Sequence, residues 1–123
     1  MKVFAAAVVV SLVAIAPAVA QERDPNQRQI LVDLSRVIGE AHALRQICDG
    51  PEDQFWRSRM MSMLETEDAD FAFAERLRNA FNTGFVSRKA EHLSCSAATR
   101  EAEAAVSAKG QALARALAQG RHR

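Results

Sequence analysis

The sequence has no excess of charge of either sign. Of its 16 Lys and Arg residues, Lys2 lies in the first twenty positions, which leaves 15 basic residues against 15 Asp and Glu. A nucleic-acid binder or a polybasic membrane-surface protein needs a large positive field, so the composition excludes both classes. The period-two alternation of a half-buried β-strand is also missing, and no internal repeat is present.

The sequence also lacks the local motifs of catalysis and cofactor binding. It contains no G-x-S-x-G, no H-E-x-x-H and no Gly-rich phosphate loop. The acidic segment that begins at Glu65 does not fit a calcium-binding EF-hand loop, because Asp70 and Arg76 stand where that loop needs Gly and Glu. We therefore expect no enzyme, no cofactor and no metal, and we interpret the acidic segment as a solvated corner at a helix N-terminus.

The first twenty residues have the organisation of an export signal. Met1-Lys2 is a short positive start, Val3–Ile15 is an apolar run, and small residues precede Ala20. The run is shorter than the about 20 apolar residues of a membrane-spanning helix. We predict cleavage after Ala20, a periplasmic location, and no stable membrane insertion after cleavage.

Cysteine occurs only twice, at Cys48 and Cys95. An exported chain meets an oxidising compartment, so a disulfide between them is the default prediction, and the loop-entropy model assigns about 4 kcal/mol to such a bridge. An intermolecular bridge or a thiol-based site is the alternative, although no C-x-x-C spacing supports a redox enzyme. Together with His42 and His92 the cysteines could ligate zinc, but their spacing matches no zinc motif.

Apolar residues recur at three- and four-residue steps along the rest of the chain, which predicts an all-α protein: a single small bundle of about four helices. We expect a flexible segment over 21–26, a helical domain over 27–119 and a tail over 120–123. Asp24-Pro25-Asn26-Gln27 has the pattern of a capping box with Pro at the first helical position.

The helix boundaries are predicted from turn-forming and capping residues. Asp49-Gly50-Pro51 ends the first helix, with Pro51 as the first residue of the second. Inside the first helix, Gly39 costs about 1 kcal/mol relative to alanine unless close packing requires it. The third helix carries Phe71 on its apolar stripe and continues through 82–84, for which a turn is the alternative. Ser94 or Ser96 caps a last, alanine-rich helix over 97–119, which we expect to form well but to bury little surface.

Several arginines lie in or beside the apolar stripes. Arg45 lies on the stripe of the first helix, and Arg57 can pair with Asp53 at i and i+4. Guanidinium groups beside an aromatic side chain and a methionine could bind an anion or a partner's carboxylate, while the alternative is a set of structural ion pairs. The candidate partner-binding or ion-pair surface comprises Arg45, Asp53, Trp56, Arg57, Arg59 and Met60.

Three stretches and one cysteine carry a resemblance to a known family. AHALRQIC at 41–48, DQFWRSRM at 53–60, AFNTGF at 80–85 and the lone Cys95 resemble small exported alphaproteobacterial proteins grouped as a domain of unknown function, DUF2385. The resemblance covers roughly Ile30 to Cys95, and the last helix is generic. It implies a signal peptide and two well-separated cysteines that form a disulfide, and it implies no activity.

These observations favour a non-enzymatic periplasmic module that binds another envelope protein of unknown identity. One alternative is a periplasmic stress chaperone, in which exposed methionines and phenylalanines of the second helix hold unfolded chains. The L-T-x-x-Q-type motif of small helical envelope chaperones is missing. A further alternative is a small metal- or thiol-dependent protein.

Overall fold

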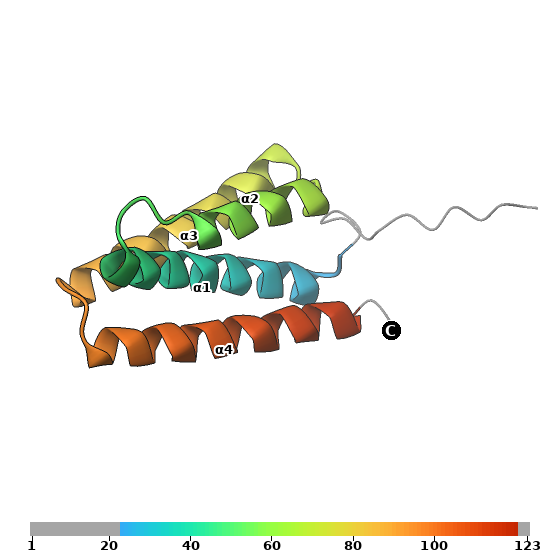
Figure 1. The fold of residues 1–123 in the computed structure, drawn as a ribbon. Helices are drawn as coiled ribbons and strands as arrows, with labels where there is room; N and C mark the ends of the chain where they lie inside the picture. Colours follow the sequence, from blue (N-terminus) through green and yellow to red (C-terminus); the bar gives the residue numbers. More distant parts are fainter. Residues whose placement is uncertain (1–22, 121–123) are drawn as a thin grey trace, which may run out of the picture.

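The computed structural model describes residues 23–120. The predicted export signal, its cleavage point after Ala20 and the last three residues lie outside this range. Within it the chain forms four α-helices and no strand: α1 (Pro25–Asp49), α2 (Phe55–Glu67), α3 (Phe71–Glu91) and α4 (Ala97–Gly120). The prediction of an all-α protein of about four helices is confirmed (Figure 1).

The long helix α1 lies at the centre, with α4 along one side and α2 and α3 along the other (Figure 1). Each of the other three helices packs on α1. One buried cluster joins α1 to α2, α3 and the end of α4, and a second joins α1 to the middle of α4. The first contains Leu31, Leu34, Ile38, Met60, Phe73, Leu77 and Leu117, and the second contains Val37, Ala41, Leu44 and Val106. Burying such side chains contributes about 1.5–3 kcal/mol each.

The start of α1 is fixed by two sets of contacts. The predicted capping box is present: the Gln27 amide donates to the Asp24 carboxylate (2.8 Å), and the Asp24 amide donates to the Gln27 side chain (3.4 Å). Just before it, the buried guanidinium of Arg23 makes two hydrogen bonds to the carboxylate of Glu67, at 2.7 and 2.8 Å. Residues 23–26 are thus part of the fold, in contrast to the flexible segment expected over 21–26.

The helices α1 and α3 cross at two glycines. A Cβ atom built on Gly39 would meet the backbone carbonyl of Phe81, and one built on Gly84 would meet the backbone carbonyl of Arg36. Close packing therefore explains why Gly39 stands inside a helix. Because α3 runs unbroken through 82–84, the helix predicted for this stretch is confirmed.

The connection from α1 to α2 is longer than predicted. Gly50 does have a positive φ of 106°, but α2 begins only at Phe55, so the prediction that Pro51 is its first residue is wrong. The intervening residues form a turn, in which the Asp53 amide donates to the Gly50 carbonyl (3.1 Å). The Asp53 carboxylate then accepts a hydrogen bond from the backbone amide of Phe55 at the start of α2 (3.2 Å).

The acidic corner between α2 and α3 turns at Asp68, whose φ is 45°. Asp70 then caps α3 by accepting a hydrogen bond from the Phe73 amide (2.8 Å). The prediction that Phe71 lies on the apolar stripe is wrong, because its side chain is 81% exposed. As the first residue of α3 it points outward, while Phe73 fills the core.

The alanine-rich helix α4 packs mainly on α1 and buries only Thr99, Val106 and Leu117. Ser96 caps α4, because the Ser96 hydroxyl accepts a hydrogen bond from the backbone amide of Thr99 (3.3 Å). As expected from its composition, α4 buries little surface. Several of its alanines are exposed, namely Ala98, Ala105, Ala112 and Ala116.

Candidate functional site

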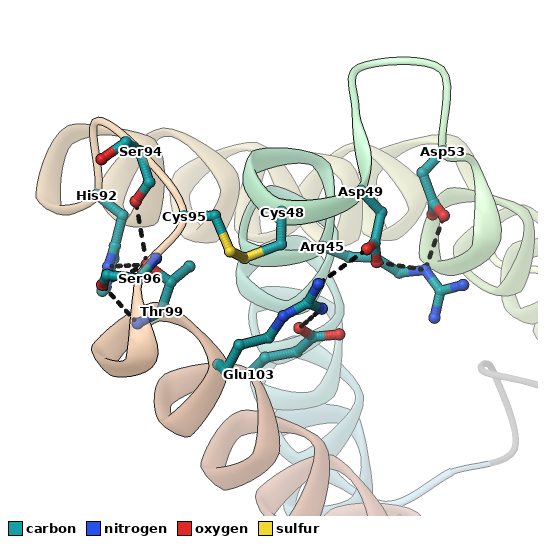
Figure 2. Close-up of polar contacts among 11 residues, drawn as sticks. Arg45, Cys48, Asp49, Asp53, His92, Ser94, Cys95, Ser96, Thr99 and Glu103 are labelled. Atoms are coloured by element: carbon teal, nitrogen blue, oxygen red, sulfur yellow. Dashed lines mark hydrogen bonds and ion pairs between the residues drawn. A yellow bond between two sulfur atoms is a disulfide. The ribbon is translucent and has the colours of Figure 1, made fainter.

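The disulfide ties the end of α1 to the start of α4. Cys48 and Cys95 are bonded with their Cα atoms 4.8 Å apart, which confirms the predicted pairing (Figure 2). Beside it, Arg100 on α4 donates to the Asp49 carboxylate at 3.1 Å. Both sulfurs are in the disulfide, so neither is a thiolate ligand for zinc. Within residues 23–120 no group of three or more His, Cys, Asp or Glu is arranged to hold a metal ion.

The Arg45 side chain pairs with Asp53 across the turn before α2 (Figure 2). Its Nε donates to the Asp53 carboxylate at 2.8 Å and lies 3.9 Å from Asp49. The hydrogen bond from Arg45 holds the pKa of Asp53 below its usual value, and the Phe55 amide adds to the effect. The predicted pairing of Asp53 with Arg57 is wrong. Asp53 lies in the turn and not in the helix, so the i, i+4 geometry does not apply to it.

A stack of side chains is built around Phe55, at the first turn of α2. The guanidinium carbons of Arg45 and Arg59 lie 4.5 and 4.3 Å from the centre of the Phe55 ring. The Trp56 ring meets Phe55 edge-on, with 5.0 Å between centroids. Phe55 thus links three of the predicted site residues, although it is not among the predicted six. In the sequence, the one indication of this role was that Phe55 lies between Asp53 and Trp56, two of the predicted residues.

The remaining two predicted residues lie elsewhere. The Met60 side chain is 3% exposed and is the residue through which α2 joins the buried core on α1 and α3. Arg57 is exposed, and its positive charge acts on His42, which contacts α3. The six residues therefore do not form one surface: Arg45, Asp53, Trp56 and Arg59 come together, whereas Arg57 and Met60 do not join them.

A groove of about 580 Å³ runs between α2 and α4, with α1 as its floor; we call it the α2–α4 groove. Its volume is within the range of ligand pockets. Arg59 is the only charged residue among those that line it. The lining residues are Leu34, Val37, Ile38 and Ala41 of α1, Phe55, Trp56 and Arg59 of α2, and Val106, Ser107, Gly110, Gln111 and Ala114 of α4.

A second groove, of about 550 Å³, lies on the other flank of α4, and we call it the charged groove. Glu40 is central to it, because its carboxylate pairs with Arg88 at 3.1 Å and with Arg36 at 3.4 Å. Three of its five charged residues, Arg36, Glu40 and Arg88, are thus paired with one another. The lining residues are Asp33, Arg36, Val37, Glu40, Arg88, Ala105, Val106, Lys109 and Leu113.

His42 is buried between α1 and α3, with its ring 5.7 Å from that of Phe81 and 5.3 Å from that of Phe85. Its Nδ1 atom is buried and has no hydrogen-bond partner among the described residues. Burial lowers the pKa of His42, and the charges of Arg57 and Lys89 lower it further, against the opposite effect of Asp53. The lowered pKa favours the neutral ring, which packs against Phe81 and Phe85.

The described part of the chain is a disulfide-linked protein of four helices with an apolar groove beside an arginine–aromatic stack. No helix in this part is long and apolar enough to span a membrane. The chain belongs to the family described as a protein of unknown function, DUF2385, which matches residues 25–120 and so includes the last helix as well as the first three. No relative was found among curated proteins or solved structures.

Proposed function

We propose that this chain is a non-enzymatic binding module of the cell envelope, and that it binds its partner in the α2–α4 groove. The observation that carries the proposal is the composition of the groove: an apolar floor from α1, the only tryptophan of the chain, and one arginine, Arg59. Tryptophan and arginine are the side chains that most often dominate binding energy at protein interfaces.

The periplasm is the compartment that we propose for this function. The Cys48–Cys95 disulfide is compatible with an oxidising compartment. The organisation of Met1–Ala20 supports export and cleavage after Ala20. In this compartment the partner is another component of the envelope.

Site-specific photo-crosslinking in cells tests the proposal. A photoreactive amino acid at Ser107 would face the α2–α4 groove, while one at Ala112, about 140° around α4, lines neither groove. We expect a discrete adduct from position 107 and none from position 112.

In a second experiment, a bulky substitution on the wall of the groove blocks it without changing a core residue. Ala114→Phe adds a ring to the groove wall, and Ala112→Phe adds the same ring to the outer face of α4; both positions are exposed. We expect the first substitution to abolish the Ser107 adduct and the second to leave it unchanged. Equal adducts from positions 107 and 112, or an adduct that survives Ala114→Phe, would contradict the proposal.

The chaperone alternative requires a broad exposed apolar surface. On α2 the Met60 side chain is buried, Met63 is half-buried, and Met61 and Phe55 are exposed. We expect a stoichiometric excess of the mature protein to leave the aggregation of a model unfolded substrate unchanged. Suppression of aggregation that persists in Ala114→Phe would favour the chaperone function over binding in the groove.

A further inference from the structure

The α2–α4 groove has the length of a short helical contact. Its floor on α1 extends from Leu34 to Ala41, and its wall on α4 extends from Val106 to Ala114. At 1.5 Å per residue these stretches are about 10 and about 12 Å long. An amphipathic helix that binds through side chains at i, i+3 or i+4, and i+7 spans the same distance.

The walls of the groove favour a helix over an extended peptide. All three sides of the groove are α-helices, whose backbone N–H and C=O groups already bond within the helix. An extended segment would therefore leave its own backbone groups without partners, whereas a helix satisfies them internally.

The edges of the groove favour an occupant with one polar side. The edge on α4 is formed by Ser107, which is half-buried, and by Gln111 and Ala114, which are exposed. At the opposite edge Phe55 is 40% exposed. An amphipathic helix would turn its polar face to the water above the groove. An acyl chain has no such face and would remain partly in water, at a cost set by its exposed apolar area.

The charge at the groove is positive and held in place. Arg59 lies over the rings of Phe55 and Trp56, at 4.3 and 5.7 Å, and makes no ion pair within residues 23–120. Ring contacts of this kind occupy the face of a guanidinium and leave its in-plane N–H donors available. The neighbouring Arg45 already donates to Asp53. Since no carboxylate lines the groove, an occupant that carries one would supply the missing acceptor.

We infer that the α2–α4 groove binds an acidic amphipathic helix of a partner protein. Apolar side chains of about two turns lie on Leu34, Ile38 and Trp56, and an Asp or Glu at the edge of that helix binds Arg59. This inference rests on the proposed function, because it specifies what the same groove recognises.

Selection from a displayed peptide library tests the inference. The library contains helical peptides of about 16 residues, or about four turns, and the target is the oxidised mature protein. We expect enrichment of apolar residues at i, i+3 or i+4, and i+7, with Asp or Glu at one flanking position. Arg59→Glu should change the enriched flanking residue to Lys or Arg. Arg78→Glu is the matched control, because Arg78 is an exposed arginine on α3 that pairs with Glu75, and it should leave the acidic preference unchanged.

Binding measurements on a selected peptide separate the charge from the shape. Trp56 is the only tryptophan and lines the groove, so its fluorescence reports occupancy. Replacing the acidic residue of the peptide with Gln should weaken binding to the wild type about three- to tenfold and should not change binding to Arg59→Gln. Ala114→Phe should abolish binding of both peptides, and Ala112→Phe should affect neither.

Three results would overturn the inference. The first is a selection without an acidic preference, or one that Arg59→Glu does not change. The second is a change in Trp56 fluorescence on addition of laurate, together with a selection that yields no binding peptide. A lipid would then be the occupant. The third is an absence of helical peptides while the Ser107 adduct is still formed in cells; the binding function would then stand with a partner of different chemistry. Loss of that adduct as well would remove the proposed function itself.

Discussion

Replacing Gly39 with alanine should push α1 and α3 apart. The added methyl group would meet the backbone carbonyl of Phe81. A carbonyl in the middle of a helix cannot rotate away, so α3 must shift as a unit. The shift would loosen the neighbouring contacts of Phe73 and Leu77, which belong to the same core.

The expected magnitude follows from two opposing effects. Overpacking of a core costs about 1–3 kcal/mol, and more when a backbone must move, while the change from Gly to Ala inside a helix stabilises it by about 1 kcal/mol. We expect Gly39→Ala to lower the free energy of unfolding by about 2 kcal/mol. For a domain of this size the melting temperature should then fall by about 10 °C.

Gly110→Ala is the matched control, because Gly110 is also a glycine inside a helix that packs on α1. It lies inside α4, and its added methyl group would contact only the Val37 side chain, at 3.3 Å. We expect this change to be neutral or to stabilise the protein by up to about 1 kcal/mol. Urea unfolding with the disulfide intact, followed by circular dichroism, measures both variants. A Gly39→Ala protein as stable as the wild type would refute the close crossing of α1 and α3.

Three further perturbations test other parts of the fold. Replacing Cys48 and Cys95 with serine opens a bridge across 47 positions, so the free energy of unfolding should fall by about 4 kcal/mol; an unchanged urea midpoint would contradict this. Burial lowers the pKa of His42, so the folded state binds fewer protons, and stability should fall as the pH drops below about 6.5. His42→Leu should flatten that slope, and an equal slope in both proteins would show that another group titrates. Arg23→Met leaves the buried Glu67 carboxylate unpaired and should cost about 3 kcal/mol, whereas adding Glu67→Leu should restore most of the loss. A double variant no more stable than the single one would argue against the buried pair.

The sequence predicts those features that depend on local chemistry. The capping box at Asp24, the continuous helix through 82–84 and the four helices follow from residue spacing and capping groups. The disulfide follows from there being only Cys48 and Cys95 in a chain that the sequence predicts to be exported. The reason for Gly39 could be anticipated as close packing, but its contact with Phe81 could not, because it depends on how two distant helices cross.

The candidate site was predicted less well, for the same physical reason. Residue spacing places Asp53 one helical turn from Arg57, yet the turn before α2 brings it to Arg45 instead. Phe55 gains its role from two arginines that come from different helices. The wall of the groove on α4 could not be recognised from the sequence. Its Gly, Ala, Ser and Gln residues form no motif, and they become part of a groove only because the fold places α2 opposite them.

The position of α4 couples the two grooves. Val37 of α1 and Val106 of α4 line both the α2–α4 groove and the charged groove, so this pair of side chains separates the two. The disulfide before the start of α4 and the buried Leu117 near its end hold the helix against α1 on either side of that pair. A substitution that shortens or enlarges either valine would therefore change the shape of both grooves at once.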